Sequence, residues 1–335
     1  MNIRDVAEAA GVSTATISRV LNRKADVKPE TREKVLRVIE QLNFRPRTGR
    51  AEPDTVGLFA PMDNIRYQGS PYFLDFLSGV SHGVFGFDLN LEIMSLRRIP
   101  KTRSDFVALC YERRICCGVF VQTTVLDTFV ADLIANLPFV VVGNHLGDGV
   151  PNVRSDNYGG AYKMVRYLIE QGHTRIGIVV DDLRFPDHVE RFEGYCQAFA
   201  DAGLDLDENN LFKIAHGVHS QADVEHAVRA MLGRDGSPTA IVASNTFVAA
   251  DVIRIIHSMG LSIPEDVSVA GFDDDVYSVR LSPPLTTVRQ PVYELGEAAV
   301  MMALGLYRGT VGPEDTSVVL DTDLVIRGSV GPPKA

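Results

Sequence analysis

Residues 3–22 read IRDVAEAAGVSTATISRVLN, and this stretch decides how the N-terminal part of the chain folds. Apolar side chains recur at i, i+3, i+4 and i+7 counted from Ile3, which is the spacing of one helix face. Gly11 supplies the backbone freedom that a turn needs, and Ser13 is a suitable N-cap for a second helix. The stretch therefore predicts two short amphipathic helices joined by a glycine turn.

The second predicted helix turns a small, polar and basic face outward, because Ile17, Val20 and Leu21 occupy its inward positions. Small side chains let a helix approach base edges, hydroxyls reach bases or phosphates, and arginine donates two hydrogen bonds to guanine. This composition is typical of a DNA-recognition helix, although a hairpin within an ordinary helix bundle is the alternative interpretation. The candidate DNA-contacting residues here are Ser13, Thr14, Ala15, Thr16, Ser18, Arg19 and Asn22.

The distribution of charge separates the N-terminus from the rest of the chain. Residues 1–50 hold eleven Lys/Arg and six Asp/Glu, a net +5, whereas the whole chain carries −10, so the remainder carries −15. Only the N-terminal part is suited to a phosphate backbone, and an acidic body limits non-specific adhesion to DNA.

Length and composition limit the remaining classes. With 335 residues and 45% hydrophobic content the chain can form more than one core. It has no apolar run near 18 residues and no signal peptide, so we expect a cytoplasmic protein with no membrane partner. His173 is expected to be structural, as are the four cysteines, with redox sensing as their alternative role: Cys110, Cys116, Cys117 and Cys196.

From about residue 55 short apolar runs alternate with helical stretches, which predicts parallel sheets with crossover helices. There are too many runs for one sheet of ordinary width, so two α/β subdomains with a ligand between them are expected. The predicted strands are Val56–Ala60, Leu89–Met94, Cys116–Val121, Phe139–Val142, Ile176–Val180, Ala240–Ala243 and Val267–Ala270.

Long motifs throughout the chain resemble the LacI/GalR (lactose-repressor) family. The N-terminal pair of predicted helices, followed by VKPETREKVLRVIEQLNFRP with a third helix from about Pro29 to Leu42, is similar to the headpiece of that family. The resemblance continues in VRSDNYGGAYKMVRYLIEQGHTRIGIVV, RFEGYCQAFADAGL, VSVAGFDDD, SPPLTTVRQP and LVIRGSV. It implies a small all-α helix-turn-helix headpiece plus an α/β periplasmic-binding-protein-like receptor of two doubly wound parallel-sheet subdomains.

The resemblance also implies a division of the chain. A DNA-binding domain is expected over 1–46, a short basic linker over 47–54 and an effector-binding and dimerisation domain over 55–330. Within the receptor the N-subdomain is expected at about 55–154 and 287–314, and the C-subdomain at about 155–286 and 315–330. The chain would then cross between them near 155, 287 and 315.

Several receptor residues suit a polyhydroxyl ligand. Arg191 opens a helix after a loop, and Asp273 ends a strand, so a cationic fork and carboxylates face a cleft and can clamp vicinal hydroxyls. By resemblance Arg191, Asp273 and Asn245 match effector-contacting positions; an Arg191–Asp273 salt bridge without a ligand role is the alternative. Thr246 departs from the Asp that the family commonly has there. The remaining candidate effector residues are Tyr72, Phe73 and Asn144, with core filling as the alternative for Phe73.

The linker departs from the family pattern as well. It lacks the leucine of a hinge helix, and Pro46, Gly49 and Pro53 make a stable helix improbable. We expect instead an extended arm whose Arg47 and Arg50 enter an A·T-rich minor groove. A plain flexible linker is the alternative.

Together these features predict a transcriptional regulator and not an enzyme. Repression relieved by a sugar is the first expectation, with corepression by a ligand or activation at some promoters as the alternatives. Its expected partners are a pseudo-palindromic double-stranded DNA operator, a small-molecule effector and a second copy in a homodimer. Neither a cofactor nor a metal is expected, because Asp273-Asp274-Asp275 comes without a glycine-rich phosphate loop. A sugar-binding protein without DNA binding is the alternative class.

Overall fold

Three short helices form the N-terminal unit of the computed structural model, which describes residues 3–21, 27–42, 53–62, 69–124, 127, 129–147, 149–214 and 221–334. We call this unit the headpiece; its helices are α1 (Ile3–Ala10), α2 (Thr14–Leu21) and α3 (Pro29–Gln41). Val6, Ile17 and Val35 are fully buried at its centre. Gly11 has φ +61°, a left-handed conformation that lets α1 end and α2 begin within three residues. The predicted helix-turn-helix is confirmed.

The first lobe of the receptor is built on a parallel sheet in the order β11-β5-β4-β3-β1-β2. Helices α5 and α12 contribute to the core on one side, and α6 and α7 to a second core where Phe59 and Phe120 stack at 4.5 Å. The elements are β1 (Thr55–Ala60), α5 (Pro71–Phe85), β2 (Asn90–Ser95), the 3-10 turn η1 (Leu96–Arg98), α6 (Arg103–Glu112), β3 (Ile115–Val121), α7 (Phe129–Ile134), β4 (Phe139–Val142), β5 (Asn152–Ser155), α12 (Val292–Arg308), the 3-10 turn η3 (Pro313–Asp315) and β11 (Ser317–Leu320).

The second lobe repeats this plan with a sheet in the order β12-β10-β9-β8-β6-β7, in which only β12 is antiparallel to its neighbour. Helices α8 and α9 build one core, and α10 and α11 the other. The elements are α8 (Asn157–Glu170), β6 (Ile176–Val180), α9 (Pro186–Asp201), the 3-10 turn η2 (Glu208–Asn210), β7 (Leu211–Lys213), α10 (Gln221–Leu232), β8 (Ala240–Ala243), α11 (Thr246–Ser258), β9 (Ser268–Asp273), β10 (Thr286–Arg289) and β12 (Asp323–Val325).

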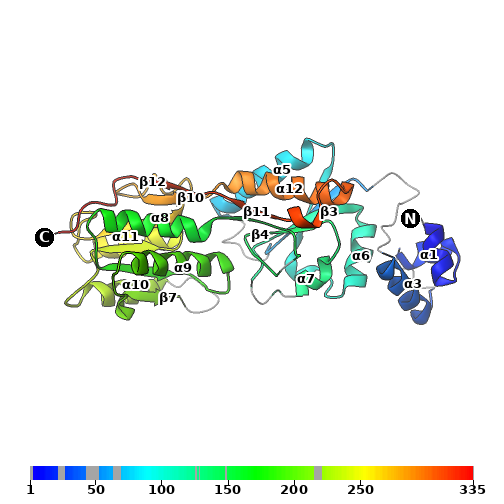
Figure 1. Cartoon of the computed structure of the whole chain (residues 1–335), viewed down its shortest axis with the longest axis horizontal. Helices are drawn as coiled ribbons and strands as arrows, with labels where there is room; N and C mark the ends of the chain where they lie inside the picture. The colour runs from blue at the N-terminus through cyan, green and yellow to red at the C-terminus, as the bar shows by residue number, and fades with distance from the viewer. Residues whose placement is uncertain are drawn as a thin grey trace.

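The headpiece and the two lobes follow one another along the long axis of the molecule, with the headpiece at one end and the second lobe at the other (Figure 1). The two doubly wound parallel sheets confirm the predicted fold class. All seven predicted strands are present, with bounds that shift by three residues or fewer.

The chain passes between the lobes three times, and one of these crossings corrects the expectation. The first lies between Ser155 and Asn157, after β5. Because β10 pairs with β9, the second falls after Arg289, close to the expected 287; because β11 pairs with β5, the third falls after Leu320 and not near 315. Backbone pairing, which continues to the ends of both strands, sets these positions.

Helices α5 and α12 cross so closely that only glycine fits at the contact. A Cβ atom on Gly79 would lie 1.9 Å from the carbonyl oxygen of Tyr293, and one on Gly296 would lie 2.4 Å from that of Phe76. Real side chains never approach a backbone atom so closely. These two glycines therefore set the distance between the helices.

The last described residues of the chain stabilise the second lobe through buried hydrogen bonds. Ser329 is fully buried, and its Oγ donates to the carbonyl of Val269 at 2.6 Å and accepts from the amide of Thr286 at 2.8 Å. His173 is also fully buried, with Nε2 2.9 Å from the carbonyl oxygen of Gly331. Burial lowers the pKa of His173 below its usual value. The expected structural role of His173 is confirmed.

Candidate functional site

The outward face of α2 is the first candidate surface. Ser13 caps the helix, since its Oγ accepts from the amide of Thr16 at 3.1 Å. Thr14, Ala15 and Arg19 are exposed, while Ser18 is half-buried. The side chains that sequence reasoning placed outward are thus arranged along one helix that begins at a fixed cap.

Part of the DNA-contacting prediction lies outside the described residues. This applies to Asn22, to Arg47 and Arg50, and to most of the linker over 47–54. Their assignment stays a prediction.

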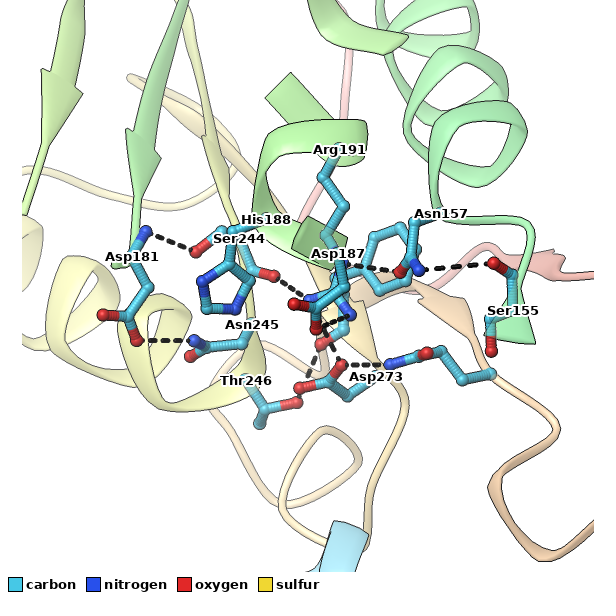
Figure 2. A network of polar contacts seen from close by, with 12 residues as sticks. Ser155, Asn157, Asp181, Asp187, His188, Arg191, Ser244, Asn245, Thr246 and Asp273 are labelled. Atoms are coloured by element: carbon cyan, nitrogen blue, oxygen red, sulfur yellow. Dashed lines mark hydrogen bonds and ion pairs between the residues drawn. The ribbon is translucent and has the colours of Figure 1, made fainter. Parts of the chain in front are cut away.

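Arg191 is the centre of a polar network in the second lobe (Figure 2). Its side chain is only 5% exposed, Nε donates to Oδ1 of Asn157 at 2.9 Å, and Nη1 donates to the carbonyl of Ser244 at 2.6 Å. Carboxylate oxygens of Asp187 and Asp273 each lie 3.5 Å from the guanidinium, which also lies 3.9 Å from the centre of the Phe272 ring. One buried cation therefore joins α8, α9 and the ends of β8 and β9.

Asp273 lies at the end of β9 in a left-handed backbone conformation, with φ +98°. Burial raises the pKa of Asp273, against the opposing effects of Arg191 and of the hydrogen bond that Gln290 Nε2 donates to Oδ1 at 2.7 Å. The Arg191–Asp273 ion pair that was the alternative interpretation is present in the structure. A ligand that binds Arg191 or Asp273 therefore competes with the ion pair for the same donor and acceptor atoms.

The remaining candidate effector residues occupy different environments. Asn245 caps α11 and donates from Nδ2 to Asp181 at 2.9 Å. Asn144 is 2% exposed and donates to Thr123 Oγ1 at 3.0 Å. Tyr72 is half-buried on α5 of the first lobe. Its pKa is raised first by burial and then by the carboxylates of Asp187 and Asp273, so its ring lies opposite the polar network of the second lobe.

The expectation that Phe73 lines the pocket is not supported. Its side chain is 3% exposed and belongs to the apolar core of the first lobe together with Phe76 and Val80. Ser70 caps α5 by accepting from the amide of Phe73, which starts the helix so that this ring faces the sheet. Core filling, the alternative, describes Phe73 in the structure.

A cavity of about 190 Å³ lies beside Tyr72, where residues of both lobes and of the second crossing meet. Tyr72, Asp75 and Tyr293 line it from α5 and α12, and Asp273, Asp274 and Gln290 line it from the second lobe. Asp274 is neutralised by Arg327 at 2.6 Å and Arg289 at 2.8 Å. Carboxylates and aromatic rings both line this cavity, which adjoins the strand ends at which doubly wound folds bind ligands.

Sequence reasoning missed several members of the network. Asn157, Asp187, Ser244 and Gln290 contact Arg191 or Asp273, yet they are far apart in the chain, and the quoted motifs that contain Asn157 and Gln290 do not single them out. The signal available was positional, because Ser244 directly follows a strand and Asp187 is in the first turn of α9.

Other candidate chemistries find little support. Among the residues that the structure describes, no group of three or more His, Cys, Asp or Glu side chains is placed to hold a metal ion. The thiols of Cys116 and Cys117 lie 3.8 Å apart on buried β3, and burial raises the pKa of Cys110.

Thr246 is buried and donates to the carbonyl of Phe272, so its hydroxyl stabilises the fold. No helix in the described part of the chain is both long and apolar enough to span a bilayer.

A helix-turn-helix unit followed by a two-lobed receptor with polar groups at its strand ends defines the class of ligand-controlled DNA-binding regulators. Comparison with known proteins assigns this chain within that class. The family described as "Bacterial regulatory proteins, lacI family" matches residues 2–47, and the "Periplasmic binding protein-like domain" matches residues 165–330.

Relatives match nearly the whole chain. The transcriptional regulator GalR of Escherichia coli is 30% identical over 99% of this chain and 96% of its own, and MalR of Streptomyces coelicolor is 31% identical over 98% and 96%. The solved structure of a "transcriptional regulator CelR-cellobiose complex" superposes with a TM-score of 0.73 at 27% identity, covering 98% of this chain and 99% of that one. The chain therefore belongs to the LacI family of helix-turn-helix transcriptional regulators.

Proposed function

We propose that this protein is a repressor of carbohydrate-metabolism genes whose affinity for a pseudo-palindromic DNA operator is controlled by a sugar. The observation that carries the proposal is that one chain holds both an exposed recognition face on α2 and a buried polar network at the strand ends of the receptor. A relative of known structure is described as a cellobiose complex, which supports a neutral sugar as the effector class.

The proposed DNA-binding domain covers residues 1–46, and its exposed Thr14, Ala15 and Arg19 would contact the base edges. Ser13, Thr16, Ser18 and Asn22 would complete this surface by contacts to bases or phosphates. The proposed linker over 47–54 would place Arg47 and Arg50 in the minor groove. A DNA-binding regulator of this kind works in the cytoplasm, where its operator is.

The proposed effector site lies in the receptor domain, over 55–330, between the two lobes. Carboxylate and amide groups of Asp273, Asn245 and Asn144 accept from and donate to hydroxyls, and Tyr72 offers a ring against the apolar face of a sugar. A sugar that exchanges hydrogen bonds with Arg191 would change how the lobes meet. Coupling of about 1–3 kcal/mol changes operator affinity by roughly 5- to 150-fold.

A homodimer is proposed because both lobes expose large apolar side chains. Leu74 and Phe85 on α5 are 53% and 68% exposed, and Phe247, Tyr277 and Val279 of the second lobe are 49%, 44% and 53% exposed. Exposed apolar patches commonly mark interaction sites, and a palindromic operator requires two recognition helices related by a two-fold axis. Sedimentation of the full chain checks this; a monomer at micromolar concentration would contradict it.

The central experiment is selection of bound duplexes from a random DNA pool with the full-length protein, with and without neutral mono- and disaccharides. Recovery of a palindrome whose retention falls when one sugar is added supports the proposal. Retention that rises with the sugar would mean corepression. An A·T-rich centre supports the arginine arm, whereas a centre on C-G favours an apolar side chain that inserts between base pairs from the minor groove. If no sequence is enriched at low salt, the protein is a sugar sensor that does not bind DNA.

Two arginine variants separate reading of bases from attraction to phosphates. Arg19→Ala should weaken binding to the selected palindrome by roughly 5- to 150-fold, since a bidentate contact to a base contributes about 1–3 kcal/mol. Arg37→Ala is the matched control, because Arg37 is exposed on α3 and its substitution removes the same charge from the headpiece. Equal losses in the two variants would contradict base reading by Arg19.

A further inference from the structure

Helix α6 of the first lobe has two apolar faces. Phe106 and Cys110 are buried against the sheet of that lobe, as expected for a crossover helix. Val107 and Tyr111, one residue further along, are half-buried and contact the apolar core of the headpiece. Figure 1 shows α6 as the element of the first lobe that faces the three-helix unit. The second face of α6 is therefore covered by the headpiece.

A specific polar contact accompanies this packing. The Tyr111 hydroxyl is hydrogen-bonded to the side chain of Ser18, and burial raises the pKa of Tyr111. Ser18 lies on α2, one helical turn after Thr14 and Ala15 and beside Arg19. It is half-buried, whereas those three neighbours are exposed. Contact with α6 thus covers one edge of the face that we assign to DNA.

DNA and α6 compete for this edge. A hydroxyl that is held by a phenol under partial burial is not available to a base or phosphate, and a tyrosine ring at that position occupies space that a DNA backbone needs. We propose that α6 is a docking surface for the recognition helix, and that docking through Val107 and Tyr111 holds the free protein in a state that excludes DNA. This inference rests on the proposed assignment of α2 as the recognition helix.

Docking of this kind lowers the apparent affinity for every DNA sequence. The observed dissociation constant equals the intrinsic constant divided by the undocked fraction, so a protein that is nine-tenths docked binds about tenfold more weakly than an undocked one. Because α6 is continuous with β3 through Arg113 and Arg114, the docking surface is part of the first lobe and moves with it.

The test measures binding of a fluorescent 30-base-pair duplex of mixed sequence, at low salt, to full-length variants. Tyr111→Ala is expected to tighten binding up to about tenfold. Tyr111→Phe, which keeps the ring and loses the hydrogen bond to Ser18, should show a smaller gain. Tyr158→Ala is the matched control, since Tyr158 is an exposed tyrosine on α8 of the second lobe, and it should bind like the parent chain. Unchanged or weaker binding by both Tyr111 variants overturns the proposal.

Hydrogen exchange of the unmodified protein gives a second test that no substitution can disturb. Addition of the duplex should raise exchange in peptides that cover 103–112 while it lowers exchange over 14–21. Exchange over 103–112 that stays constant or falls on DNA binding overturns docking. Failure of the parent chain to bind any duplex would instead remove the proposed function, so the two failures are distinguishable.

Discussion

Replacing Arg191 by methionine tests whether one buried cation organises the second lobe. The methionine keeps most of the apolar volume, including contact with the Phe272 ring, but leaves Asp273 without its ion pair. Breaking a buried pair by removing one partner costs about 3–5 kcal/mol. Asp273→Asn should cost less, about 1–2 kcal/mol, because Arg191 keeps Asp187, Asn157 and the Ser244 carbonyl.

The double variant and the pH dependence make the test specific. Residues of one network couple by about 0.5–3 kcal/mol, so Arg191→Met/Asp273→Asn should be more stable than the sum of the single losses predicts. Burial already raises the pKa of Asp273, and loss of Arg191 raises it further. Between the unfolded value near 3.9 and that raised pKa the native state binds more protons, so stability rises as pH falls. The deficit of Arg191→Met should therefore shrink from pH 7 toward pH 5.

Urea unfolding followed by far-UV circular dichroism is the suitable assay, because the chain has no tryptophan. The unfolding midpoints of the parent chain, both single variants and the double variant are compared at pH 5 and pH 7. If Arg191→Met lowers stability by less than about 1 kcal/mol, or by the same amount at both pH values, the guanidinium does not neutralise Asp273 and the network is secondary.

Two further predictions concern the packing of each lobe. Gly79→Ala should destabilise the first lobe by about 1–3 kcal/mol or more, because the new Cβ meets the Tyr293 carbonyl at 1.9 Å. Gly86→Ala is the control: its Cβ would lie 3.5 Å from the nearest atom, and the free energy of unfolding should change by no more than about 0.5 kcal/mol. Equal urea midpoints for the two variants would show that the helices move apart freely. His173 is buried with a lowered pKa, so the unfolded chain takes up its proton first and stability should fall as pH drops through about 6.5. His173→Asn should lose this part of the dependence in melting curves between pH 7.5 and 5.5, and parallel curves would refute the assignment.

The parts of the fold that the sequence predicts are those with strong hydrophobic patterns. Strands such as β3 and β4 are uniformly apolar because both faces are covered, and the headpiece helices have regular apolar spacing and caps. Strands β10 and β11 escaped prediction for different reasons. Thr286 and Thr287 of β10 are polar yet fully buried, and β11 is an edge strand with Val319 45% exposed. The hydrophobic patterns of β10 and β11 therefore do not differ from that of a loop.

The site was predictable only where strand ends indicate it. Arg191 and Asp273 were brought together correctly because the start of a helix and the end of a strand lie at the same edge of the sheet, although α9 begins at Pro186 and Arg191 lies in its second turn instead of opening it. Their partners Asn157 and Gln290 come from the first and second crossings between the lobes, and these crossings lie beside strands β5 and β10, whose pairing the sequence pattern did not indicate. Phe73 was misplaced because sequence alone does not fix the rotation of α5 about its axis.

The buried Ser329 and the residues beside it have a consequence for the order in which the newly made chain becomes functional. The second sheet is held together by residues that leave the ribosome after all of its strands, and the first lobe is incomplete until α12 and β11 have been made. The headpiece needs only residues from the first part of the chain, and domains generally fold as they emerge from the N-terminus. During translation the unit assigned to DNA is therefore complete well before the receptor that would control it.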